Sequence, residues 1–269
     1  MTNIAKHWFL IFIFIKSQTA VTGGRNSNAT PAQSPVVGCN YSEIHQKFKM
    51  KKIKIILISV LALSFSNFSF GQTNDRNFGE ILQSYYLYRD KDIIEKTIDF
   101  INNTKMDYNS LNPILTGFFG ALFLNDTILK STFNSNLNKV EKTDIKRLLT
   151  SLSSANIDSI YSKSKITAAF NDMNWSSFFA TGNKKYLDNI ISNIPYAENR
   201  SDINLFLAGA SAKWSLCSNS KQDKVVKNYL TTLQNNNKVI KEILSKDQQD
   251  YREEMVNILR KQKEKGIWN

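Results

Sequence analysis

Hydrophobic residues recur every three to four positions along most of the chain after residue 77, a spacing that is typical of amphipathic α-helices. The clearest example is the segment W-S-S-F-F-A-T-G-N-K-K-Y-L-D-N-I-I-S-N-I at residues 175–194. Its second half places five apolar side chains on one helical face: Tyr186, Leu187, Ile190, Ile191 and Ile194. Gly182 tolerates the positive φ that ends a helix, and Asn183 is a favourable N-cap for the next helix. The pattern therefore predicts two helices joined by a tight turn.

The same pattern recurs elsewhere in the chain. A shift of 39 residues without a gap places Trp214 opposite Trp175 and aligns a second apolar stripe with the first. That stripe consists of Val225, Val226, Tyr229, Leu230 and Leu233. A shift of 93 residues toward the N-terminus places residues 84–86 opposite residues 177–179, and a fainter copy contains Phe118.

Repeated helix pairs with periods of about 35–45 residues are typical of helical solenoids, because stacked neighbours bury a stripe that one pair leaves exposed. We therefore predict an all-α, solenoid-like fold of stacked antiparallel helix pairs. An ordinary antiparallel bundle, in which such stripes arise by chance, is the alternative. No segment alternates for long enough to predict a sheet. The predicted helices are at residues 78–88, 91–103, 111–124, 126–136, 142–153, 157–162, 164–181, 184–194, 201–217, 222–235 and 238–263.

Prolines and short polar residues define several helix ends. Pro113 is expected in the first turn of its helix, where a missing N–H is tolerated. Pro195 is expected to end the helix before it, and Asp202 or Ser201 to cap the next. The long, charged final helix suits the end of an array, with Trp268 either folded back or exposed.

Residues 50–71 have the pattern of a secretory signal peptide. A lysine-rich region, an apolar core at Ile55–Leu63 and small residues at Ser69 and Gly71 follow one another, which predicts cleavage before Gln72. An uncleaved membrane anchor is the alternative. The apolar stretch is short and serine-rich, however, compared with the roughly 20 apolar residues that span a bilayer.

Met50 is therefore the expected start of the exported chain. Residues 1–49 are interpreted as a disordered leader or an upstream start-site artefact, because residues 23–35 are rich in Gly, Asn, Ser and Pro. Residues 72–269 form the predicted mature domain, located in the periplasm or outside the cell. Contact with a membrane is expected only through the signal peptide before its cleavage.

Net charge gives little support for nucleic-acid binding. The whole chain carries 35 basic and 23 acidic residues, a net charge of +12. Eight of those basic residues and one acidic residue lie in residues 1–71, so the predicted mature part carries only +5. A mild excess spread along helices is typical of a solvated face. No nucleic-acid partner is predicted, and association of the basic C-terminal helix with a membrane surface is a minor alternative.

The predicted mature part lacks the residues that many catalytic and metal sites require. His7, His45 and Cys39 all lie in the leader, which leaves Cys217 as the single cysteine and no histidine. This excludes the usual Ser-His-Asp and Cys-His systems, histidine zinc sites and disulfides within one chain. Phosphate loops, dinucleotide turns, calcium loops and CxxC motifs are absent from the sequence. No catalytic residue, cofactor or metal is predicted. Cys217 is interpreted as a small buried residue, and a disulfide to another chain is the alternative.

Five residues on two predicted helices are candidates for a binding surface: Asp172, Trp175, Phe179, Lys213 and Trp214. An aromatic stripe at helical spacing belongs more often to the core, so packing is the favoured interpretation of the three aromatic residues. Asp172 lies in an apolar helix, where burial raises the pKa of a carboxyl group and permits acid catalysis. A carboxylate that hydrogen-bonds a neighbouring helix or faces water is the commoner case.

The alternative function is that of a carboxylate-dependent hydrolase acting on a cell-envelope glycan. Such an enzyme needs two carboxyl groups on either side of a cleft. Asp172, Asp188 and Asp202 are candidates, but no motif pairs them.

The runs W-S-S-F-F-A-T-G-N-K-K-Y-L-D-N-I-I and A-S-A-K-W-S-L-C-S-N, within residues 172–222, resemble uncharacterised exported bacterial helical proteins. Those proteins are similar in outline to tetratricopeptide-like arrays, although the early Trp-x-x-Leu-Gly-x-x-Tyr pattern is missing here. The resemblance covers under a third of the predicted mature chain and implies fold and export, not an activity. The predicted function is therefore that of a helical-repeat protein that acts as a protein-interaction or scaffold module with a protein partner.

Overall fold

The computed structural model describes residues 76–268, and this part of the chain is all-α, with no strand among those residues. Its α-helices are α3 (Phe78–Tyr88), α4 (Ile93–Asn103), α5 (Tyr108–Asn125), α6 (Thr127–Asn136), α7 (Thr143–Leu152), α8 (Ile157–Lys163), α9 (Ala168–Thr181), α10 (Lys185–Ser192), α11 (Ile203–Gln222), α12 (Lys224–Leu233), α13 (Lys238–Ser245) and α14 (Gln248–Glu264). The short 3₁₀ helices η1 (Leu137–Lys139) and η2 (Ile194–Glu198) follow α6 and α10. The predicted all-α class is confirmed for the described residues.

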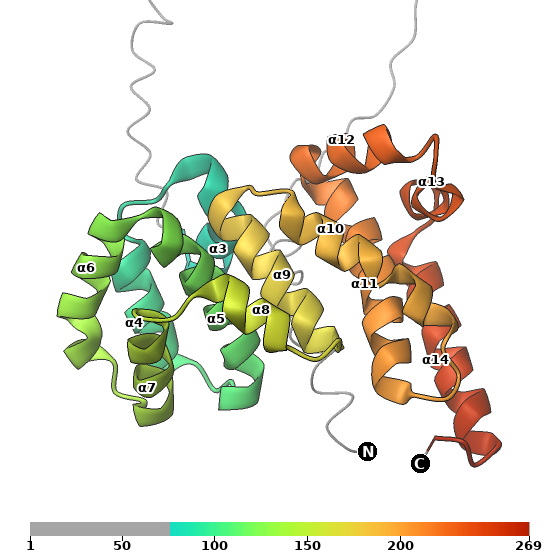
Figure 1. Ribbon diagram of the computed structural model, residues 1–269, viewed down its shortest axis with the longest axis horizontal. Coiled ribbons are helices and arrows are strands. Elements are labelled where there is room, and N and C mark those ends of the chain that lie inside the picture. The colour runs from blue at the N-terminus through green and yellow to red at the C-terminus, as the bar shows by residue number, and fades with distance from the viewer. Residues whose placement is uncertain (1–75, 269) are drawn as a thin grey trace, which may run out of the picture. The chain divides into compact units, whose positions relative to one another are not determined.

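Three long helices, α5, α9 and α11, form the centre of this region. Helix α9 packs against both α5 and α11, and α3 packs against α9 as well. Figure 1 shows α6 and α7 beyond α5 at one end and α12, α13 and α14 beyond α11 at the other. Because α5, α9 and α11 have neighbours on several sides, they bury residues all around, whereas α10, α12 and α13 bury one face.

Short polar residues begin several helices by accepting backbone N–H groups of the first turn. The caps of α5, α6, α11 and α12 are Asp107, Asp126, Asp202 and Asp223. Gly182 ends α9 with a φ of 72°, as predicted. Asn183 is not the N-cap of α10, because Lys184 occupies that position. The Asn183 side chain nevertheless accepts the backbone N–H of Lys185, with an N–O distance of 3.1 Å.

A buried asparagine joins α9 to α11 and to the end of α10. Asn171 Nδ2 donates to the carbonyl oxygen of Ala208 at 2.7 Å and to Ser211 Oγ at 2.8 Å. Its Oδ1 accepts from Asn193 Nδ2 at 2.7 Å. Every polar atom of the Asn171 amide group is thus paired, which is what a buried amide requires.

Two glycines permit the closest helix contacts. A Cβ atom at Gly117 of α5 would lie 2.1 Å from the carbonyl oxygen of Met173 in α9. Ser177 Oγ donates to the Gly117 carbonyl oxygen at 2.7 Å, which fixes the same contact from the other side. A Cβ atom at Gly209 of α11 would lie 1.9 Å from the backbone nitrogen of Ala197 in η2. No side chain fits at either position without moving a backbone segment.

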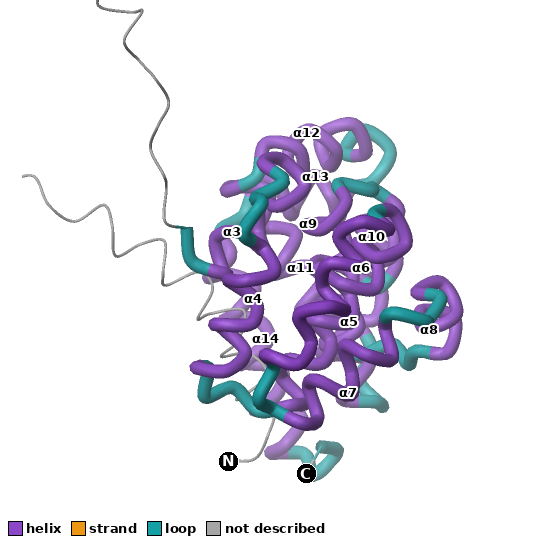
Figure 2. Tube along the Cα trace, turned by 90° about the vertical axis from the view of Figure 1, so that its left-hand side faces the viewer, coloured by secondary structure: helices purple, strands orange, loops and turns teal. Residues whose placement is uncertain are grey.

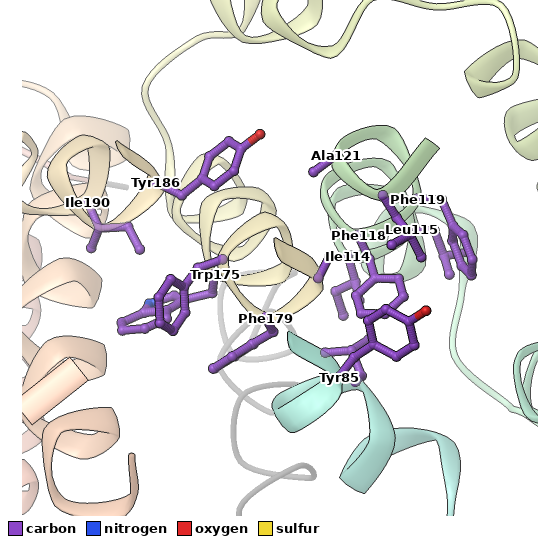
Figure 3. Packing of buried hydrophobic residues seen from close by; sticks show 14 of the residues in the cluster. Tyr85, Ile114, Leu115, Phe118, Phe119, Ala121, Trp175, Phe179, Tyr186 and Ile190 are labelled. Atoms are coloured by element: carbon purple, nitrogen blue, oxygen red, sulfur yellow. The ribbon is translucent and has the colours of Figure 1, made fainter. Parts of the chain in front are cut away.

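The hydrophobic core is continuous from α3 through α5 to α9 and α10. Figure 3 shows Tyr85 of α3 next to Phe118 of α5, whose ring centroids are 5.5 Å apart. In the same view Trp175 and Phe179 lie next to each other on α9, and their rings stack with centroids 5.5 Å apart. Pairs of this kind contribute about 0.5–1.5 kcal/mol beyond the burial of their surface.

Helix α5 begins earlier than predicted. Asp107 accepts the backbone N–H of Ser110 at 2.9 Å and starts the helix at Tyr108. Pro113 is therefore the sixth residue of α5 and is not in its first turn, which corrects the prediction. A proline at this depth leaves the carbonyl oxygen of Asn109 without an i+4 donor.

The last predicted helix, at residues 238–263, is two helices in the structure. Asp247 and Asp250 form a capping box that begins α14, so the chain leaves helical geometry between α13 and α14. Trp268 folds back and packs on Phe206, with ring centroids 5.0 Å apart. The C-terminus is therefore attached to α11.

The predicted signal peptide at residues 50–71 and the leader at residues 1–49 lie outside the described residues. None of the helices in the described part combines the length and apolar character that crossing a bilayer requires.

Candidate binding cleft

An open cleft of about 660 Å³ lies between α5, α7, α8 and α9. Figures 1 and 2 both show α7 and α8 next to α5. The volume falls within the range of about 300–1,000 Å³ that is usual for sites of small molecules. We call it the α5–α9 cleft, and its two walls differ in chemistry.

The wall formed by α5 is polar. Asn109, Asn112 and Thr116 recur at helical spacing and line the cleft from one face of α5. Thr116 Oγ1 donates to Asn112 Oδ1 at 2.9 Å, and Asn112 Nδ2 donates to the hydroxyl of Tyr108 at 3.1 Å. The Asn109 side chain is exposed and has no hydrogen bond within residues 76–268. An amide donor and an amide acceptor are therefore free at this wall.

The lining that comes from α7, α8 and α9 includes the apolar residues of the cleft. They include Leu148, Leu152, Ile160, Phe170 and Met173. Tyr161 supports this part of the lining from behind, because its hydroxyl donates to the Met173 carbonyl oxygen at 2.9 Å and its ring meets Phe170 edge to face. Burial raises the pKa of the Tyr161 hydroxyl, so it stays a neutral donor at physiological pH.

Lys165 lies between α8 and α9 at the rim of the cleft. Its side chain is exposed and makes no ion pair or hydrogen bond to the described residues. Thr167 follows as the N-cap of α9 and accepts the backbone N–H of Phe170 at 3.2 Å. The other first N–H groups of a helix have no intrahelical acceptor and carry partial positive charge. This rim therefore combines a free ammonium group with the positive end of α9.

The aromatic members of the predicted binding surface are in the core. Trp175, Phe179 and Trp214 are 5%, 7% and 3% exposed, so the packing interpretation is confirmed and they present no exposed aromatic surface. Trp175 and Trp214 belong to the same buried cluster, and Trp175 Nε1 donates to Ser215 Oγ of α11 at 2.9 Å. Cys217 is also buried, as expected.

The polar members of that predicted surface do not line the cleft. Lys213 pairs with Glu198, with 3.3 Å between Nζ and Oε1. Asp172 is partly exposed, and burial raises the pKa of its carboxyl group to about 7. Since that pKa lies above the value in an unfolded chain, Asp172 lowers the free energy of unfolding as the pH rises from about 4 to about 7. A role of Asp172 and Lys213 in binding stays a prediction.

Two of the three carboxylates considered for glycan hydrolysis have structural partners. Asp188 accepts a hydrogen bond from the hydroxyl of Tyr229, and burial together with this bond raises the pKa of Tyr229 to about 12. Asp202 caps α11. Within the described chain, Asp107 is the one carboxylate that lines the cleft, and it caps α5. No three His, Cys, Asp or Glu side chains gather as metal ligands among residues 76–268.

Sequence reasoning missed the cleft residues. The available indication was the spacing of Asn109, Asn112 and Thr116 in a segment otherwise rich in Leu, Ile and Phe. The other faces of this helix are apolar and buried. A stripe of polar residues on such a helix indicates a face that does not pack in the core. No sequence pattern indicated that Lys165 lines the cleft, because lysines are common in segments that connect helices.

No protein-family model, curated protein or solved structure matches the chain. The resemblance to tetratricopeptide-like arrays therefore gains no support from a relative, and the function is argued from the cleft and the helix arrangement.

Proposed function

We propose that the chain is an exported helical-repeat protein that binds a segment of a protein partner in the α5–α9 cleft and catalyses no reaction itself. The observation that carries this proposal is the cleft, which joins a polar and an apolar wall and contains one carboxylate. Binding sites for other molecules are typically concave, with apolar surface for affinity and a few polar groups for orientation.

The helix arrangement supports the repeat part of the proposal. The pairs α3–α4, α5–α6, α9–α10 and α11–α12 correspond to the four sequence copies, and the two helices of each pair contact each other. The first helices of successive pairs from α5 onward also pack together, as stacked repeats do. One contact departs from a linear array, because Tyr86 of α3 donates to Asp223 at the start of α12 at 2.7 Å. The first helix pair, α3–α4, therefore contacts the last of the four pairs, α11–α12.

Export to the periplasm or the cell exterior is supported by the sequence of residues 50–71, with their basic region, apolar core and small residues before Gln72. A chain in that location meets envelope proteins and glycans. A carboxylate-dependent glycan hydrolase is the alternative, and the raised pKa of Asp172 is the observation that favours it. Asp172 does not line the cleft, however, and Asp107, the one carboxylate that does, caps α5.

Blocking the cleft is expected to abolish partner binding. Ala169 lines the cleft on α9, and an Ala169→Arg variant of the full chain places a long side chain in it. Wild type is expected to retain proteins from a solubilised envelope fraction that Ala169→Arg does not retain. Ala155→Arg is the matched control, because Ala155 is exposed and lies outside the cleft lining.

The hydrolase alternative is tested on the same preparations with purified peptidoglycan. We expect no release of reducing sugars above the protein-free blank. Release that is lost in an Asp172→Asn variant, together with identical protein retention by wild type and Ala169→Arg, would replace the binding proposal with the enzymatic one.

A further inference from the structure

The α5–α9 cleft offers a free side-chain amide that can pair with the backbone of an extended polypeptide. The Asn109 side chain provides a free N–H and a free oxygen, and Pro113 has no N–H to give to the Asn109 carbonyl oxygen. A peptide bond carries one donor and one acceptor, so a side-chain amide can pair with both. The α5 wall is thus suited to the backbone of a bound segment.

The apolar part of the same cleft comes from α7, α8 and α9. In an extended chain successive side chains point to opposite sides, so a segment paired with α5 directs every second side chain toward Phe170 and Met173. A purely apolar ligand, such as a lipid chain, would instead cover Asn109 and Asn112 without pairing Asn109, which is unfavourable. The mixed walls therefore favour a peptide over a lipid.

The rim next to α9 adds a charge preference. Lys165 has no partner among the described residues, and the first turn of α9 adds partial positive charge at the same place. A carboxylate on the bound segment is attracted to this rim and forms a charge-assisted hydrogen bond with Lys165.

We infer that the α5–α9 cleft binds an extended segment of a protein partner in which an apolar side chain is close to an Asp or Glu. The backbone of the segment pairs with Asn109, its apolar side chain contacts Phe170 and Met173, and its carboxylate meets Lys165. This inference rests on the proposed binding function and specifies the chemistry of the partner.

The test begins with selection of peptides from a random phage-displayed library on the full chain. Selected peptides are synthesised with a fluorescein label, and their dissociation constants are measured by fluorescence anisotropy. We expect an apolar residue near an Asp or Glu in the selected sequences. Lys165→Glu is expected to weaken binding about tenfold or more, since it replaces attraction by repulsion at the rim.

Two matched controls separate the cleft from general effects. Lys163→Glu has the same charge change on α8 but lies outside the lining, and we expect a change below about twofold. Asn109→Ala is expected to weaken binding about fivefold or more, because it removes both pairing groups. Asn204→Ala is its control, since Asn204 is exposed and occupies the second position of α11 as Asn109 does in α5.

Replacing the acidic residue of the peptide by its amide identifies the carboxylate contact. With the amide peptide, wild type and Lys165→Glu should bind within about twofold of each other. If wild type and Lys165→Glu bind the acidic peptide equally well, the inferred carboxylate contact is overturned. The proposal that the cleft binds a peptide is then still supported. If no peptide is selected, and dodecanoate or a chitin oligosaccharide binds in the cleft instead, the inference and the proposed function both fail.

Discussion

Gly117→Ala is expected to lower the free energy of unfolding by about 2–3 kcal/mol, because the new Cβ atom would lie 2.1 Å from the Met173 carbonyl oxygen. The obstacle is backbone, so α5 and α9 must separate to accommodate the methyl group. That separation also stretches the 2.7 Å hydrogen bond from Ser177 Oγ to the Gly117 carbonyl oxygen. Alanine is favoured over glycine in a helix by about 1 kcal/mol, and the expected net loss of about 2–3 kcal/mol already includes this gain. Urea unfolding followed by far-ultraviolet circular dichroism measures the net loss.

Gly120→Ala in the same helix is the matched control. Its Cβ would lie 2.5 Å from Ile157 Cδ1, the end of a flexible side chain that can rotate away. We expect a loss below about 1 kcal/mol, since the gain in helix propensity offsets most of the repacking. Equal losses for the two variants would show that α5 and α9 are not in backbone contact at Gly117.

Asn171→Asp is expected to destabilise the fold by about 3–5 kcal/mol at pH 8, although the two side chains have nearly the same shape. The aspartate brings a negative charge into a site that is 1% exposed and places an oxygen against the carbonyl oxygen of Ala208. The Ala208 carbonyl oxygen then loses its donor from α9 and keeps the one from Ser211 Oγ, and no cation compensates within the hydrogen-bonded group. Urea unfolding at two pH values measures the effect.

The loss should shrink at low pH. Burial raises the pKa of the new carboxyl group above its unfolded value of about 3.9, so the variant loses stability as the pH rises from about 4 and regains it on acidification. Asn228→Asp, on the exposed face of α12, should be nearly neutral at both pH values. A loss at Asn171 that is the same at pH 5 and pH 8 would contradict a buried charge as its cause.

Local features of the fold were predictable because their causes lie within a few residues. Gly182 ends α9, and the stripe from Tyr186 to Ile191 lies in α10, as the spacing indicates, whereas Ile194 belongs to η2. The capping box of Asp247 and Asp250 also depends only on neighbouring residues. It was not predicted, because the helical spacing of apolar residues continues on both sides of it. Periodicity alone does not detect a break that keeps the apolar residues in phase.

Features that depend on distant residues could not be predicted. Nothing near Asn171 in the sequence indicates that it meets Ala208, and nothing near Tyr86 indicates a hydrogen bond to Asp223, 137 residues away. The cleft has the same origin, because its walls come from four helices, and contacts such as that of Gly117 with Met173 join residues that are far apart in the sequence. Sequence patterns identified which residues are buried, but not which of them meet.

Hydrogen–deuterium exchange of the full chain, with and without the tightest selected peptide, tests binding in the α5–α9 cleft most directly because it maps where binding occurs. We expect the peptide to slow exchange in the first turns of α5 and in the segment from Lys165 to Met173, while α12 to α14 are unchanged. Protection confined to α12 to α14, or absent from both walls of the cleft, would contradict it.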